Sequence, residues 1–277
     1  MTASQTKKEL LPPALECGII DSHAHVLNEY FPDERQIIYD RAFACHVQAM
    51  INPAVTVQGL PEIIEIIDNL PQIYGAAGQH PHDAKDWCAA HRETVIKTLE
   101  HPKMVAVGEC GLDYFYNNSS REEQLLAFRE QIAIAVSLDK PIIVHCRDAW
   151  NDAFELLGAA GTNSKGARLR GVFHCFTGGP EHLDAIRELD FYVSFSGILT
   201  YSSAKSIQAA APLMAENRIL VETDCPFLAP QKVRGKRNEP SFVWWTAQKL
   251  AELRNTPLEA LAPVLSANAR DLFRLPG

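Results

Sequence analysis

Six side chains of the kinds that bind divalent cations end short hydrophobic runs in this chain. In sequence order they are His23, His25, Glu109, His145, His174 and Asp224. Mixed imidazole and carboxylate ligands suit zinc, manganese, iron or nickel, and carboxylates with water can hold magnesium. The six together predict a binuclear metal centre, which indicates metal-assisted hydrolysis.

The first three of these side chains set the geometry that we expect. His23 and His25 are two residues apart on a predicted strand, so both imidazoles should project from one face and reach one ion. Glu109 ends a run of small and β-branched residues, where an unpaired carboxylate would be costly to bury. A cation beside Glu109 would remove that cost, and a carboxylate can bridge two metals. The alternative is a salt bridge from Glu109 to Arg147 or to a lysine.

The last carboxylate is expected at the rim of the site. Because Pro226 follows closely, the chain must leave the strand there and present Asp224 at the mouth. Glu222 shares the strand face of Asp224, so we expect it beneath, where it would support a ligand or contact the substrate.

Further polar residues could bind an anionic substrate. His80 and His82 follow the third predicted strand, and Arg147 follows the fifth. Thr177 and two glycines precede a predicted helix, whose N-terminal amides could bind a phosphate. The alternatives are that His82 is a solvated loop histidine and that Thr177 is a helix cap.

The elements that must position these residues alternate along the chain. Eight apolar runs are predicted as buried parallel strands: residues 18–23, 47–52, 73–78, 104–109, 141–145, 170–174, 191–196 and 219–223. Segments with helical periodicity separate them, and two amphipathic helices follow the last strand. The first strand runs into DSHAHV and not into a glycine-rich turn, which argues against a dinucleotide fold. We therefore predict a single α/β domain, a (β/α)8 TIM barrel over residues 18–277, with the metal site at the C-terminal ends of its strands.

Composition excludes some classes of function. A net charge of −8 and a pI near 5.7 argue against coating nucleic acid through a broad basic face, although a small phosphate-binding cleft remains possible. Seven cysteines cannot all pair, which favours a reduced compartment. Four of them directly follow a proposed ligand, and strand alternation should turn their side chains towards the outer helices: Cys110, Cys146, Cys175 and Cys225.

The N-terminal residues lack the features of a signal peptide, because two prolines interrupt their apolar stretch. We expect residues 1–17 to be a flexible extension and the protein to be cytoplasmic. We expect no membrane segment, and no feature of the sequence indicates an obligate protein partner.

The motifs DSHAH, GQHPH, GECGLDY, VHCRDA, FHCFTG, VETDCPFLAP and RNEP resemble those of the TatD family of metal-dependent deoxyribonucleases, within the amidohydrolase-like superfamily. The resemblance covers about residues 18–274. It implies two divalent cations (Mg, Mn or Zn) and hydrolysis of DNA phosphodiesters from the 3′ end, on single strands or at duplex ends. It also implies that His23, His25, Glu109 and Asp224 hold one metal and that Glu109, His145 and His174 hold the other. The pattern departs from the family at Thr177, where the family often has serine.

The catalytic residues expected on this basis are Asp224, as general base towards a water between the metals, and Glu109, as the bridging ligand. A second possibility is a metal-dependent deacylase acting on aminoacyl-tRNA, or another ester or amide hydrolase. A third is a metal-binding scaffold without catalysis.

Overall fold

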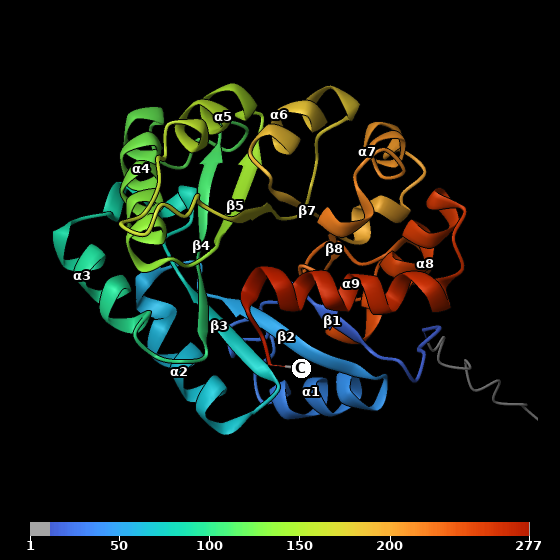
Figure 1. The fold of residues 1–277 in the computed structure, drawn as a ribbon. Helices are drawn as coiled ribbons and strands as arrows, with labels where there is room; N and C mark the ends of the chain where they lie inside the picture. The colour runs from blue at the N-terminus through green and yellow to red at the C-terminus, as the bar shows by residue number, and fades with distance from the viewer. Residues whose placement is uncertain (1–11, 277) are drawn as a thin grey trace, which may run out of the picture.

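The computed structural model describes residues 12–276, which contain one eight-stranded parallel sheet with helices around it (Figure 1). The strands follow one another around the sheet in chain order, each parallel to the next. They are β1 (Ile19–Asp21), β2 (Val47–Pro53), β3 (Ile73–Ala77), β4 (Met104–Asp113), β5 (Ile142–Arg147), β6 (Gly171–Phe173), β7 (Tyr192–Phe195) and β8 (Ile219–Val221). The predicted TIM barrel is confirmed.

The helices cover the outside of the strands, as Figure 1 shows. They are α1 (Arg35–Ala44), α2 (Leu60–Asn69), α3 (Ala89–Thr98), α4 (Arg121–Leu138), α5 (Trp150–Gly158), α6 (Leu183–Glu188), α7 (Lys205–Ala210), α8 (Val243–Arg254) and α9 (Leu258–Phe273). The longest, α4, begins at a capping box in which Ser120 and Glu123 satisfy each other's backbone N–H groups. None of the helices in residues 12–276 is long and apolar enough to cross a membrane.

Along most strands, alternate residues enter two different apolar layers. On β5, for example, Ile143 belongs to the cluster inside the barrel, whereas Ile142 and Val144 belong to the layer between strands and helices. The alternation is the one expected for a pleated strand that is buried on both faces.

The cysteines that follow proposed ligands obey the same alternation in three cases. Cys110, Cys146 and Cys225 are buried in the layer between strands and helices, as predicted. Cys175 differs: it is half-buried, and its Sγ atom lies 3.2 Å from Ser196 Oγ.

The first and last strands are joined by the segments that follow them. The backbone N–H groups of Ser22, His25 and Asp224 donate to the carbonyl oxygens of Val221, Cys225 and His23, at 3.1, 2.9 and 2.9 Å. The Asp21 carboxylate adds bonds from Thr223, through its backbone N–H and its hydroxyl. These bonds close the barrel at the end of the strands where the proposed ligands lie.

Several strand boundaries differ from the prediction, and those of β1 and β4 affect the site. β1 ends at Asp21, because the Asp21 carboxylate accepts a hydrogen bond from the backbone N–H of His23 and takes it out of the strand ladder. β4 continues four residues past Glu109, after a shift of register between Val107 and Cys110. At Gly111, φ is +143° and any Cβ atom would collide with the carbonyl oxygen of His145, so only glycine lets β4 continue this close to β5. The predicted N-terminal extension falls mostly on residues 1–11, outside the described residues.

Candidate metal centre

The first half of the centre brings together the segments that follow β1 and β8. His23 Nε2 and His25 Nε2 lie 3.0 Å apart, and both face Oε2 of Glu109, at 3.2 and 3.5 Å. Oδ1 of Asp224 lies 3.9 Å from His23 Nε2 and 3.5 Å from His25 Nε2. The pair thus reaches one point, as predicted, although both histidines follow β1 and do not lie on it.

The second half gathers around the other oxygen of Glu109. Oε1 lies 3.2 Å from His80 Nε2, 3.1 Å from His145 Nδ1 and 2.8 Å from His174 Nε2. Glu109 is therefore in contact with five imidazole rings through its two oxygens. The alternative of a salt bridge to Arg147 is wrong, because Arg147 points to aromatic rings elsewhere.

The spacing of these atoms fits bound cations. Ligand atoms about 2.1 Å from a tetrahedral ion lie roughly 3.4 Å from one another. The distances among His23, His25, Glu109 Oε2 and Asp224 run from 3.0 to 3.9 Å. In addition, His174 Nε2 lies 2.8 Å from Glu109 Oε1 and forms, with His23 and Glu109, a group of three possible ligand atoms within 4.8 Å of one another. Buried imidazole and carboxylate groups this close together are suited to share an ion.

Burial and neighbouring charges together set the pKa values of the side chains in the centre. Burial alone would raise the pKa of Glu109, but the protonated His174 imidazole beside it, first among its imidazole neighbours, outweighs burial and holds that pKa well below its usual range. Burial lowers the pKa of His80 to about 4, so this ring is neutral and its lone pair is free to bind a cation. For His25 burial also lowers the pKa, but Asp224 and Glu109 outweigh it and raise it to about 9. Metal binding at His25 is therefore coupled to the release of a proton.

Two buried carboxylates lie behind the histidines. Oδ2 of Asp113, at the end of β4, lies 2.9 Å from His145 Nε2 and 3.0 Å from His82 Nε2. Glu222 accepts a 2.6 Å hydrogen bond from the backbone N–H of Cys175 and lies 3.4 Å from His174 Nδ1. Glu222 thus lies against a proposed ligand, where it could fill the first of its two expected roles. Asp113 was not predicted, although it follows Glu109 in GECGLDY, because β4 was expected to end at Glu109.

The residues predicted to bind substrate lie in different parts of the site. His80 lies inside the cluster against Glu109, where it could hold a metal with Glu109 and His145. Arg147 ends β5, and its guanidinium carbon lies 3.9 Å from the ring centroid of Phe115. Thr177 is exposed, and its hydroxyl donates to the carbonyl of Cys146 at 3.4 Å. The helix after Thr177 is a single 3-10 turn (Pro180–His182) followed by the six residues of α6.

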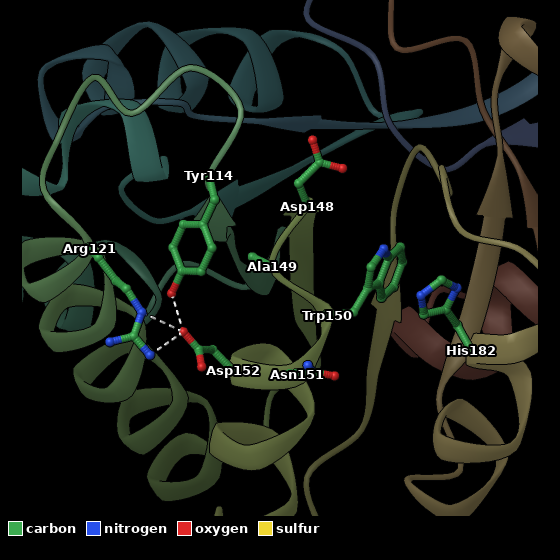
Figure 2. Close-up of a pocket in the computed structure, with 8 residues that line it drawn as sticks. All are labelled: Tyr114, Arg121, Asp148, Ala149, Trp150, Asn151, Asp152 and His182. Atoms are coloured by element: carbon green, nitrogen blue, oxygen red, sulfur yellow. Dashed lines mark hydrogen bonds and ion pairs between the residues drawn. The ribbon is translucent and has the colours of Figure 1, made fainter.

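A cavity of about 580 Å³ opens between the starts of α4 and α5 (Figure 2), and none of the six proposed ligands lines it. In Figure 2 Trp150 and His182 lie on one side of it and Tyr114 on the other, while Arg121 bonds Asp152. Asp148 also lines the cavity. The carboxylates of Asp148 and Asp152 outnumber the one guanidinium, that of Arg121, so the net negative charge of the wall disfavours the binding of a phosphate.

Comparison with known proteins identifies the family. The family model described as TatD-related DNase matches residues 20–274. The uncharacterized metal-dependent hydrolase YabD of Bacillus subtilis (strain 168) is 37% identical over 257 residues, which cover 93% of this chain and 99% of YabD. The 3′-5′ ssDNA/RNA exonuclease TatD of Salmonella typhimurium is 30% identical over 262 residues, which cover 93% of this chain and 99% of that protein. The crystal structure of YJJV, a TatD homolog from Escherichia coli K12, superimposes with a TM-score of 0.86 at 27% identity, covering 94% of this chain and 99% of YJJV. The chain therefore belongs to the family of TatD-related DNases.

Proposed function

We propose that this protein is a metal-dependent nuclease that hydrolyses DNA phosphodiester bonds from the 3′ end of single strands with two divalent cations, Mg, Mn or Zn. The main support for the proposal is the position of the Glu109 carboxylate. Its Oε2 contacts the imidazoles of His23 and His25, and its Oε1 contacts those of His80, His145 and His174. One carboxylate between two imidazole clusters is suited to bridge two ions. The exonuclease named above, at 30% identity, supports this choice of substrate.

Different side chains of the centre have different roles in the proposed hydrolysis. When bound, two divalent cations would lower the pKa of a water molecule and polarise the phosphate oxygens. Asp224, whose Oδ1 lies at the edge of the His23–His25 pair, accepts the proton of the attacking water. The water oxygen forms a bond to phosphorus while the bond to the leaving sugar oxygen breaks, and that oxygen takes up a proton from solvent. Glu222 and Asp113 hold His174 and His145 in position.

The test is turnover across metals and substrates. Metal-depleted protein is titrated with Mg, Mn or Zn and assayed on single-stranded DNA labelled at either end, and on aminoacyl-tRNA in parallel. We expect metal-dependent loss of nucleotides from the 3′ end. Exclusive release of amino acid from tRNA would instead support the deacylase, and full metal occupancy without turnover of either substrate would support a scaffold.

Substitution at the bridge gives a matched comparison. Glu109→Gln keeps the shape of the side chain but removes its charge, so we expect about a thousandfold lower kcat/KM on single-stranded DNA. Glu188→Gln, an exposed carboxylate at the end of α6, should leave kcat/KM within twofold, roughly. Near wild-type turnover of Glu109→Gln would contradict the proposed bridge.

A further inference from the structure

Three exposed aromatic rings stand on two sides of the candidate metal centre. Phe115 and Tyr116 are each 55% exposed and Phe227 is 48% exposed. Among the exposed large hydrophobic side chains of residues 12–276 these three are the aromatic ones, and all three lie at the mouth of the barrel. The others, such as Leu213, are aliphatic. Single exposed apolar side chains are ordinary, but aromatic rings confined to the rim of a site indicate binding there.

The first pair follows β4 and adjoins one half of the centre. The rings of Phe115 and Tyr116 are 4.9 Å apart, and Tyr116 lies 5.3 Å from His82. His82 is in turn 4.4 Å from His80, which faces Glu109. A continuous row of rings therefore leads from the exposed pair to the metal cluster.

Arg147 places a positive charge beside this pair. Its guanidinium carbon is 3.9 Å from the centroid of Phe115 and 4.9 Å from that of Tyr116, within cation–π range. Asp113 fixes the backbone of the same loop, because its Oδ1 accepts hydrogen bonds from the N–H groups of Phe115 and Tyr116 at 3.0 and 2.9 Å. The rings are thus held on a fixed support, and a cation for a phosphate lies next to them.

The second pair follows β8 and adjoins the other half. Phe227 lies 5.5 Å from Tyr30, and the two rings are 6.4 and 6.3 Å from His25. Burial raises the pKa of Tyr30 to about 12, so its ring stays neutral. The metal cluster lies between this pair and the Phe115–Tyr116 pair.

We propose that the two nucleobases on either side of the scissile phosphate stack on these rings, one on Tyr116, with Phe115 packed nearly perpendicular to it, and the other on Phe227. The inference rests on the proposed nuclease function and assigns the specificity-determining residues for its substrate. Aromatic side chains stack on bases of any sequence, because every base has a π-face. Bases turned outwards to two separate platforms cannot remain paired with a second strand, so the arrangement selects single-stranded nucleic acid.

The test removes a nucleobase from the substrate and, separately, an aromatic ring from the protein. A short single-stranded oligonucleotide is compared with the same oligonucleotide that carries an abasic residue on one or the other side of the scissile bond. We expect Phe227→Ala, and the double variant Phe115→Ala with Tyr116→Ala, to lose roughly 5- to 150-fold in kcat/KM on the complete oligonucleotide. For each variant the preference for a base at the matching position should fall towards one. Leu213→Ala, an exposed residue in the segment that leads into β8, should keep the wild-type preference.

A second measurement does not require turnover. A 2-aminopurine base next to the scissile bond loses fluorescence when it stacks, so wild-type protein should quench it and the matching aromatic variant should not. Equal losses on complete and abasic substrates, or quenching that the variants retain, would overturn the stacking proposal and leave the nuclease proposal intact. Quenching without any hydrolysis would overturn the nuclease proposal alone, and the absence of both would overturn both.

Discussion

Asp113 stands behind the histidines of the centre and connects three parts of it. One carboxylate oxygen faces His145 and His82, and the other binds the backbone of the loop that carries Phe115 and Tyr116. Burial alone would raise the pKa of Asp113, but the hydrogen bonds from His145 and His82 outweigh it and hold that pKa well below its usual range. Asp113 is therefore ionised and fixes which nitrogen of His145 is free to face Glu109.

The exchange Asp113→Asn tests this role. An amide nitrogen would face His145 and His82, so the orientation of His145 should loosen and metal affinity should fall about 10- to 100-fold. Raising the metal concentration should restore most of kcat, because Glu109 and the proposed base Asp224 remain in place. Metal titration followed by activity gives both quantities. A loss of kcat that no metal concentration restores would instead place Asp113 in the chemical step.

The sequence predicted which six residues gather, because each lies at or near the C-terminal end of a strand in a fold whose strands all point the same way. Predicting the place of His80 was harder, because it follows β3 in a loop. Its approach to Glu109 depends on the backbone of that loop, whose His80 N–H donates to the carbonyl of Val55 at 2.8 Å. Periodicity carries no information about such a loop.

At the scale of the element, α4 holds the loop after β3 against the barrel. Gln131, buried on α4, accepts from the backbone N–H of Gln79 at 2.8 Å and donates to its carbonyl at 3.1 Å. Gln79 directly precedes His80, so this pair of bonds sets where the imidazole enters the cluster. A glutamine within the periodic pattern of α4 gave no sign of this partner, which is 52 residues away.

Gln131→Ala removes both bonds and leaves two backbone groups of Gln79 buried without a partner. We expect a loss of about 2–4 kcal/mol in the free energy of unfolding and weaker metal binding at the His80 side. Arg129→Ala, an exposed change on the same helix, should stay within about 0.5 kcal/mol. Urea denaturation of the two variants and of the wild type measures the difference. Equal stability of the two variants would show that the loop does not depend on α4.

At the scale of the whole molecule, three of the six proposed metal ligands lie on the seam that closes the barrel. His23 and His25 follow the first strand, Asp224 follows the last, and backbone hydrogen bonds join these segments. β1 has only three residues and β8 only three, so the strand ladder itself contributes little to closure. A cation held by ligands from both segments would therefore stabilise the closed barrel.

Removal of metal should then destabilise the entire fold and not only the site. At a metal concentration about 100 times Kd, binding to the folded state adds about 2.7 kcal/mol, which corresponds to a rise of about 5 °C in Tm for a chain of this size. Thermal unfolding with chelator and with added metal measures the rise. His25→Ala should lose most of it, because this variant lacks one ligand at the seam. His101→Ala, which removes a surface histidine paired with Asp68, should keep it in full. If His25→Ala gained as much from metal as the wild type, the stabilising ion would lie away from the seam, and closure of the barrel would depend on the backbone and the Asp21–Thr223 bonds alone.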